Sequence, residues 1–315
     1  MRERLALRRA SEIAPRAWII DDTGFPKAGR SSVGVARQYS GTLGKVGNCQ
    51  VGVSVSAASE AASCPLTWRL FLPDAWDCDA PRRAKAHLPE SERHREKWRL
   101  ALEMLDELRT WGLSPPPLVA DAGYGEITAF RAALEERELA YVVEVKAATS
   151  VYREDVLPER PAWRGAGRPP AARYRRPPAS FGALALAAGA EAACDVAWRE
   201  GSRGTMAARF LALRVRPANI GLRRAHPEGL PLAWLLCQWP EGAAEPLKYW
   251  LADLPAETTL PDLVRLAKLR WRIELDYREL KDALGLEHFE GRSLRGGSTT
   301  SRSSLWRTAS SPCSG

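Results

Sequence analysis

The stretch Trp18-Ile19-Ile20-Asp21-Asp22-Thr23-Gly24 decides the fold of this chain. Bulky apolar residues that end in an acidic pair and a glycine are typical of a buried strand followed by a loop. A similar stretch, Leu118-Val119-Ala120-Asp121-Ala122-Gly123, occurs later. If the two strands are neighbours, Asp22 and Asp121 can bring their carboxylates together, although an Asp at a strand end can also be a turn former or a helix cap.

The order of the elements around these two stretches indicates a mixed α/β sheet. Three strands come first and suggest an antiparallel meander; a helix, the strand that ends at Asp121, a second helix and a further strand follow. The predicted strands cover residues 18–22, 50–55, 66–72, 118–121 and 141–145, and the predicted helices cover residues 90–111 and 127–137.

The second half of the chain changes character. Residues 152–180 are rich in Pro and Arg and predict an irregular crossover. The arginines of residues 168–176 could contact phosphate groups, and a solvated loop is the alternative. Short strands near Trp198 and over residues 210–215, 232–239 and 248–251 indicate a β-rich insertion, and one helix over residues 261–284 follows, with a break permitted at Gly285.

Composition narrows the class of protein. With 315 residues, 45% apolar and 27% charged, the chain has the composition of a globular protein. A net charge of +8 and a pI near 9.4 suit a polyanionic partner. Six cysteines without a C-x-x-C pair favour neither a zinc knuckle nor a disulfide framework, which points to a reducing cytoplasm. Since no apolar stretch is long enough to span a bilayer, we expect no membrane partner.

The last helix carries a patterned charged face. Arg270, Glu274 and Lys281 lie four and seven residues apart and so share one face, which Tyr277 and Arg278 flank. A solvated face is the simple interpretation. Apolar residues elsewhere on this helix would anchor it, however, so the charged face could border a cleft; these are Trp271, Ile273, Leu280 and Leu284. Two strand-end carboxylates and a third on this helix could hold a pair of hard divalent cations, which suits phosphodiester cleavage.

Taken together, these residues resemble an insertion-sequence transposase of the Asp-Asp-Glu class, in the subgroup with a Tyr, Arg, Glu, Lys signature around its last acid. The similarity covers residues 17–293. The matching blocks are residues 20–27 (IDDTGFPK), 34–41 (GVARQYSG), 48–51 (NCQV), 119–125 (VADAGYG) and 270–292.

The resemblance implies an α/β fold with a ribonuclease-H-like mixed sheet flanked by helices and interrupted by a β-rich insertion before the last catalytic helix. The core would begin in residues 17–150 and end with the catalytic helix in residues 256–293, with the insertion in residues 151–255. Residues 1–16 would be a lead-in, so we expect that an N-terminal DNA-binding region is missing. For residues 294–315 we expect a frameshifted or disordered tail.

The resemblance also implies the site residues. Asp22, Asp121 and Glu274 would be the catalytic residues and the ligands of two Mg²⁺ (or Mn²⁺) ions, with Asp22 preferred over Asp21 because the family places its acid directly before the Thr. Arg270 and Lys281 match the signature residues that meet DNA, whereas the signature Tyr falls at Ala267. The expected DNA contacts further include Arg278, Lys27 and Trp250.

Trp250, with Trp239 and Tyr249, could stack on an unpaired base, and a place in the core is the alternative.

The implied activity is metal-dependent cleavage and transfer of DNA strands at insertion-sequence ends. The implied partners are double-stranded DNA, as transposon ends and target, and a second copy of the chain in a homodimer assembled on DNA. Two alternatives stay open: a truncated, inactive DNA-binding relic of a transposase, and a stand-alone nuclease with the same core fold.

Overall fold

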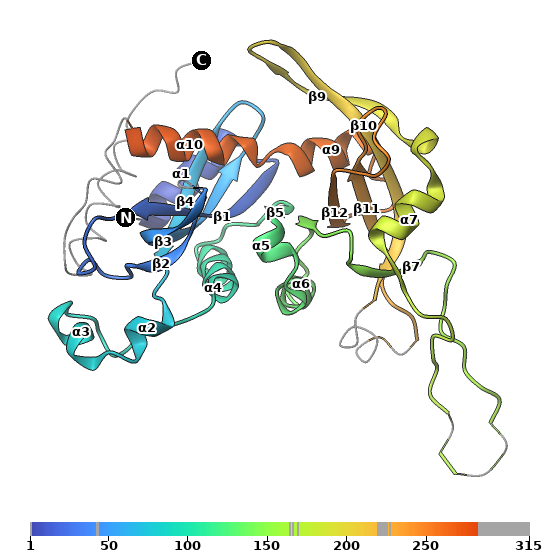
Figure 1. Cartoon of the computed structure of the whole chain (residues 1–315), viewed down its shortest axis with the longest axis horizontal. Helices are drawn as coiled ribbons and strands as arrows, with labels where there is room; N and C mark the ends of the chain where they lie inside the picture. The colour runs from blue at the N-terminus through green and yellow to red at the C-terminus, as the bar shows by residue number, and fades with distance from the viewer. Residues whose placement is uncertain are drawn as a thin grey trace. The chain divides into compact units, whose positions relative to one another are not determined.

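The computed structural model describes residues 2–41, 44–163, 165, 167–168, 170–218, 226 and 228–282. The chain divides into two compact units (Figure 1). The first consists of Met1–Pro116 together with Leu269–Gly315, and the second of Pro117–Lys268. The predicted tail and the predicted helix end at Leu284 and Gly285 lie outside the described residues.

Strand β3 organises the sheet of the first unit. It pairs with β1 along the whole of β1, with β2 through its first residues and with β4 through its last residues, always antiparallel. The predicted meander of three strands is confirmed, whereas β2 was missed because its mostly polar sequence gives no apolar signal. The strands are β1 (Ala17–Pro26), β2 (Ala36–Ser40), β3 (Lys45–Ala58) and β4 (Ser63–Leu70).

Helices pack on this sheet, and the strands are buried as a result. From Cys49 onward every residue of β3 is buried, and helices α1 (Arg2–Ile13) and α4 (Lys97–Thr110) both contact it. The strand predicted over residues 50–55 is therefore buried along consecutive residues. The apolar stripe of α4 includes Met104, Leu105 and Leu108, which are fully buried.

Helix α4 begins at Lys97, later than predicted. The residues before it are held in a non-helical path by side-chain hydrogen bonds: Arg83 donates to the carbonyls of Pro89 and Glu92, and His94 Nδ1 lies 2.8 Å from the carbonyl oxygen of Leu72. Two short helices that the sequence pattern did not predict precede this path, α2 (Asp74–Asp77) and α3 (Ala80–Lys85).

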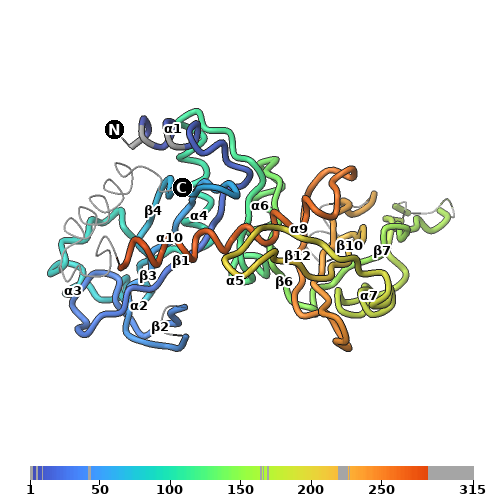
Figure 2. Tube along the Cα trace, turned by 90° about the horizontal axis from the view of Figure 1, so that it is seen from above, coloured from blue at the N-terminus to red at the C-terminus, as the bar shows by residue number. Residues whose placement is uncertain are grey.

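The helix predicted over residues 261–284 is two helices. Helix α9 (Leu260–Lys268) ends before a turn at Leu269 and Arg270, and α10 (Trp271–Asp282) begins after it. Since neither Gly nor Pro marks this turn, the sequence pattern could not reveal it. In the first unit α10 passes over β1 and contacts both β1 and β4 (Figure 2).

The second unit is built on a mixed sheet with strand order β5-β6-β12-β11-β10-β7-β8, and β9 pairs with β10. Strands β5 and β6 are parallel, and the other pairs are antiparallel. The strands are β5 (Leu118–Ala120), β6 (Tyr141–Val145), β7 (Ser150–Arg153), β8 (Ala179–Ser180), β9 (Cys194–Gly201), β10 (Gly204–Pro217), β11 (Ala233–Gln238) and β12 (Lys248–Asp253).

Helices α5 (Ala122–Gly125) and α6 (Thr128–Glu135) make the crossover between β5 and β6, as a parallel pair requires. Helix α7 (Phe181–Ala188) was not predicted, because its run of Ala and Leu lacks a clear apolar stripe. The mixed α/β class predicted from the sequence, a large mixed sheet with helices, is confirmed. The predicted domain boundaries stay a prediction, although β5, α5, α6 and β6 belong to the second unit.

Among the described helices, none combines the length and the apolar character needed to cross a membrane.

Candidate active site

The two adjacent acids of β1 point to opposite faces of the sheet, as neighbouring residues of a strand must. The Asp21 side chain is 8% exposed and accepts a hydrogen bond from Arg270 Nη1 at 3.0 Å. The Asp22 side chain is 31% exposed and accepts from Lys97 Nζ at 2.8 Å. Because Lys97 begins α4 and Arg270 directly precedes α10, Asp21 faces α10 and Asp22 faces α4.

Arg270 joins a β1 carboxylate to the predicted catalytic glutamate. While Nη1 contacts Asp21, Nη2 lies 3.3 Å from Glu274 Oε1. Glu274 is on the first turn of α10, and its side chain is 62% exposed, so its carboxylate is open to solvent. The structure therefore brings Glu274 and Arg270 together as predicted, and the β1 acid that shares this arginine is Asp21.

Tyr277 fixes α10 against the sheet. Its buried hydroxyl lies 2.7 Å from Ser54 Oγ, and its ring packs against Trp68 with ring centroids 5.6 Å apart. Ser54 is opposite Asp21 in the β1–β3 register, so Tyr277 sits beside that carboxylate. Burial, and then the negative charge of Asp21, raise the pKa of Tyr277 well above its ordinary value, which keeps the phenol protonated.

Ser54 was missed in the sequence. Its position between Val53 and Val55 in an apolar strand could have indicated its role. A buried hydroxyl needs a hydrogen-bond partner, so a serine at this position implies a polar contact.

Lys281, a predicted DNA contact, is buried and not exposed on the surface of α10. Its ammonium group donates to the carbonyl of Gly24 at 2.9 Å and stands 5.4 Å from the centre of the Phe25 ring. Lys281 therefore ties α10 to β1, and its predicted DNA contact stays a prediction. Of the other predicted DNA contacts in this unit, Arg278 is exposed on α10 and Lys27 is buried.

Trp250, the predicted DNA contact in the second unit, is 3% exposed on β12. Its ring lies 6.4 Å from that of Phe210 and 5.0 Å from Lys268 Nζ. These surroundings match the alternative of a core residue. Ala267, where the signature Tyr would fall, is also buried, on α9.

Asp121 lies in the second unit, directly after β5. It caps α5, because its Oδ1 accepts a hydrogen bond from the backbone N–H of Gly123 at 2.9 Å. Where the sequence pattern predicts a loop after Asp121, the structure has a single helical turn. The proximity of Asp121 to Asp22 and Glu274 stays a prediction.

The donor atoms suit a hard divalent cation, because the half-buried carboxylate of Asp22 and the exposed carboxylate of Glu274 are oxygen ligands of the kind that Mg²⁺ prefers. Within the described part of the chain, however, no three His, Cys, Asp or Glu side chains gather closely enough to hold a metal ion.

The sequence model of one family, described as DDE superfamily endonuclease, matches residues 1–205. The chain belongs to this family. The predicted resemblance to the Asp-Asp-Glu class is thereby confirmed. The matched range contains Asp21, Asp22 and Asp121, whereas Glu274 lies after it.

A curated relative is similar to this DDE superfamily endonuclease. The protein is described as "Probable transposase for insertion sequence element IS701" from Microchaete diplosiphon, and it is 29% identical over 147 residues. The aligned part is 46% of this chain and 35% of the relative, so the chain spans only about a third of the relative's length.

Proposed function

We propose that this chain is the catalytic part of a transposase, which cleaves and transfers DNA strands at the ends of an insertion sequence. The family supports endonuclease chemistry, and the name of the relative supports transposition. The observation that carries the proposal is the contact of Arg270 with both a β1 carboxylate and Glu274, because it places acids from two distant parts of the sequence at one point.

The ligands of the two Mg²⁺ or Mn²⁺ ions would be a β1 acid, Glu274 and Asp121. The resemblance favours Asp22, because the family's acid stands directly before the Thr. The structure supports Asp21, because Arg270 contacts both Asp21 and Glu274. When bound, such a pair of ions activates the attacking hydroxyl or water and stabilises the leaving oxygen.

The protein's own residues would prepare this site. Arg270 holds the β1 acid and Glu274 in one arrangement, and Tyr277 and Lys281 fix α10 to the sheet so that Glu274 keeps its place. Double-stranded DNA would be the substrate, and the chain would act on it as a homodimer.

Replacement of Asp121 by Asn tests the proposal. The amide keeps the size of the side chain and its cap on α5 but removes a negative ligand, so we expect Mg²⁺-dependent nicking of DNA with transposon ends to fall below detection. DNA binding, measured without metal, should stay near that of the wild type. Full cleavage by Asp121→Asn would contradict the assignment, and cleavage of DNA lacking transposon ends would favour the stand-alone nuclease.

Asp21→Asn and Asp22→Asn form a matched pair that decides between the two β1 acids. We expect Asp21→Asn to abolish nicking and Asp22→Asn to retain most of it, with circular dichroism spectra confirming that both variants fold. The reverse pattern would return the role to Asp22. If the wild type binds DNA but never nicks it, the chain is an inactive relic.

A further inference from the structure

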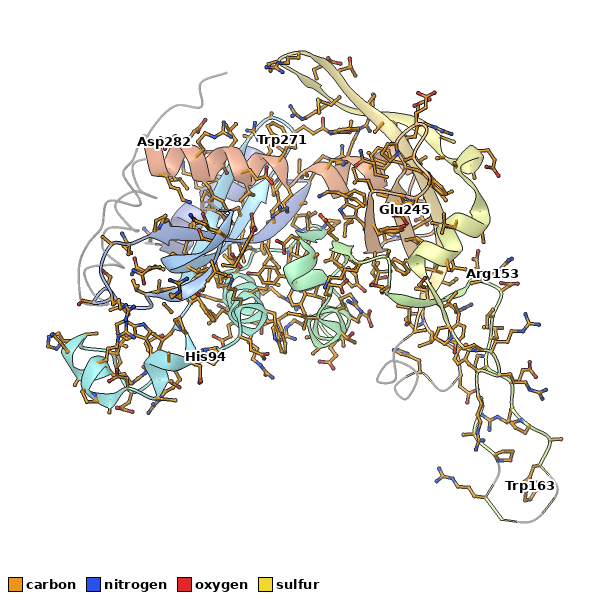
Figure 3. The ribbon with its side chains drawn as sticks, viewed as in Figure 1. His94, Arg153, Trp163, Glu245, Trp271 and Asp282 are labelled. Atoms are coloured by element: carbon orange, nitrogen blue, oxygen red, sulfur yellow. The ribbon has the colours of Figure 1, made fainter. Side chains whose placement is uncertain are left out.

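A long arm leaves the sheet of the second unit between β7 and β8. We call residues 154–178 the arginine arm. Between residues 160 and 178 it contains six arginines and no acidic residue. The arm extends away from β7 with Arg153 at its base and Trp163 near its far end (Figure 3).

Ring stacking and hydrogen bonds hold the base of the arm in place. The rings of Tyr152 and Tyr174 stack with centroids 4.4 Å apart and planes 10° from parallel. The Tyr152 hydroxyl donates to the carbonyl of Arg176 at 3.0 Å, and the backbone N–H of Leu230 donates to the Tyr174 hydroxyl at 2.9 Å. Tyr152, Leu230 and Ala218 form a small apolar cluster under these contacts. The arm therefore starts from a fixed position.

The two legs of the arm are also joined to each other. Glu159 and Arg173 exchange two backbone hydrogen bonds, each 2.9 Å long. A salt bridge of 2.8 Å between Arg175 and Glu159 connects the legs a second time. These contacts give this part of the arm the character of a two-stranded ribbon.

Part of the positive charge of the arm is not balanced by ion pairs among the described residues. Arg168, Arg173 and Arg176 are exposed, and no carboxylate of the described residues lies within ion-pair distance of them. Arg160 and Arg175 do have partners, but these pairs are exposed and therefore weak. Like charges held on one ribbon repel one another unless an anion is bound.

Trp163 adds an aromatic surface near the end of the arm. It is 55% exposed, although its indole Nε1 donates to the carbonyl of Gly167 at 3.3 Å. Guanidinium groups bind phosphate with two parallel hydrogen bonds, and an exposed indole can stack on a base or sugar. Between residues 160 and 178 the arm combines arginines and a tryptophan with no acidic residue, which suits the backbone of a nucleic acid.

We propose that the arginine arm binds the phosphate backbone of duplex DNA, with Arg168, Arg173 and Arg176 on phosphates and Trp163 against the edge of the same groove. This inference rests on the proposed function for the identity of the polyanion. The arm adds affinity without sequence preference, because phosphate contacts carry no base information.

The test compares two triple variants in an Asp121→Asn background without metal, where the DNA stays intact. The first is Arg168→Gln/Arg173→Gln/Arg176→Gln, and the control, Arg4→Gln/Arg8→Gln/Arg99→Gln, removes the same charge from exposed positions on α1 and α4. Anisotropy of a labelled duplex between about 50 and 300 mM NaCl gives the slope of log K against log salt.

We expect the magnitude of that slope to be smaller by about 2 to 3 in the arm variant, because each lost phosphate contact removes about 0.9 from it. Binding at low salt should weaken at least about tenfold. The control should change the slope by less than one. Trp163→Ala should weaken binding at least about fivefold without changing the slope. A wild-type slope and affinity in the arm variant would overturn the inference.

A cleavage assay on the wild-type chain separates this inference from the proposed function. If the wild type nicks DNA in the presence of Mg²⁺ and the arm variant has an unchanged slope, only the proposed role of the arm is refuted. Binding that depends on the arm, without any nicking by the wild type, would support the arm and contradict the catalytic proposal.

Discussion

Arg270 places one positive charge between two carboxylates, those of Asp21 and Glu274. The Glu274 carboxylate remains mostly exposed. Its oxygen atoms are of the kind that a hard divalent cation prefers. The contact therefore holds Glu274 near β1 and leaves its carboxylate open to solvent.

Lys268 is a partly buried base in the second unit whose titration should change stability. Its ammonium group lies 5.0 to 5.4 Å from the centres of the Trp198, Phe210 and Trp250 rings and contacts Gln238 Oε1 at 2.5 Å. Burial, and then the charge of Lys248, lower its pKa from 10.5 to about 8, while Glu144 opposes the shift. The aromatic faces attract the cation but do not restore its hydration.

We predict that Lys268 raises the free energy of unfolding between pH 8 and pH 10.5, and that Lys268→Met removes this contribution. In that window the folded protein has released the Lys268 proton while the unfolded chain still holds it, so the Lys268 contribution increases with pH, by about 1–3 kcal/mol. Cys237 acts in the opposite sense, because burial raises its pKa to about 12, so the quantity that isolates Lys268 is the difference between wild type and Lys268→Met at each pH. Urea denaturation at several pH values measures this.

Lys146→Met is the control for that experiment, because its side chain is 73% exposed. It should keep the wild-type pH dependence. The same change in the free energy of unfolding with pH in Lys268→Met and wild type would show that Lys268 does not titrate in this window.

At the scale of elements, α5 depends on a glycine. A Cβ atom built on Gly125 would lie 2.0 Å from the backbone carbonyl oxygen of Glu144 on β6. The single turn of α5 can therefore pack against β6 only because this position has no side chain. Since Asp121 caps the same turn, the placement of a predicted catalytic residue depends on this close approach.

Gly125→Ala should destabilise the protein by about 1–3 kcal/mol, because backbone rather than a flexible side chain must move to make room. Chemical denaturation followed by tryptophan fluorescence checks the loss. Gly29→Ala is the matched control, since nothing lies within 4 Å of the added methyl group, and it should change stability by less than about 0.5 kcal/mol. A Gly125→Ala variant as stable as this control would contradict the close approach.

At the scale of the whole molecule, the two units differ in how the chain builds them. Pro117–Lys268 is one continuous segment, whereas the first unit needs α10 from a distant part of the sequence. Helix α10 buries Ile273, Tyr277 and Leu280 in the first unit. Without α10, Ser54 would lose the partner of its buried hydroxyl.

We therefore predict that residues 117–268 produced alone melt cooperatively, and that residues 1–116 produced alone do not. Circular dichroism at 222 nm during heating measures both. Addition of a peptide covering residues 269–282 should restore structure to the first fragment, because the peptide supplies the missing buried face. A cooperative melt of residues 1–116 alone would contradict the role given to α10.

The sequence by itself determined the class of the fold and the family, because apolar runs, alternation and the Asp-Thr-Gly and Asp-Ala-Gly blocks are local features of the chain. It also predicted that Arg270 and Glu274 lie close together, although Arg270 lies in the turn before α10 and not on the helix. The single helix predicted over residues 261–284 was wrong, because the turn at Leu269 and Arg270 has no local marker.

Only the tertiary structure decided which way the decisive side chains point. Asp21 and Asp22 follow the same apolar run, and no residue of that run indicates which face of the sheet α10 covers. Lys281 and Trp250 are types of residue that suit DNA, yet their burial depends on β1 and on β10, which lie far away in sequence. The physical reason is that periodicity determines which residues share a face, whereas the partner of that face is set by long-range packing.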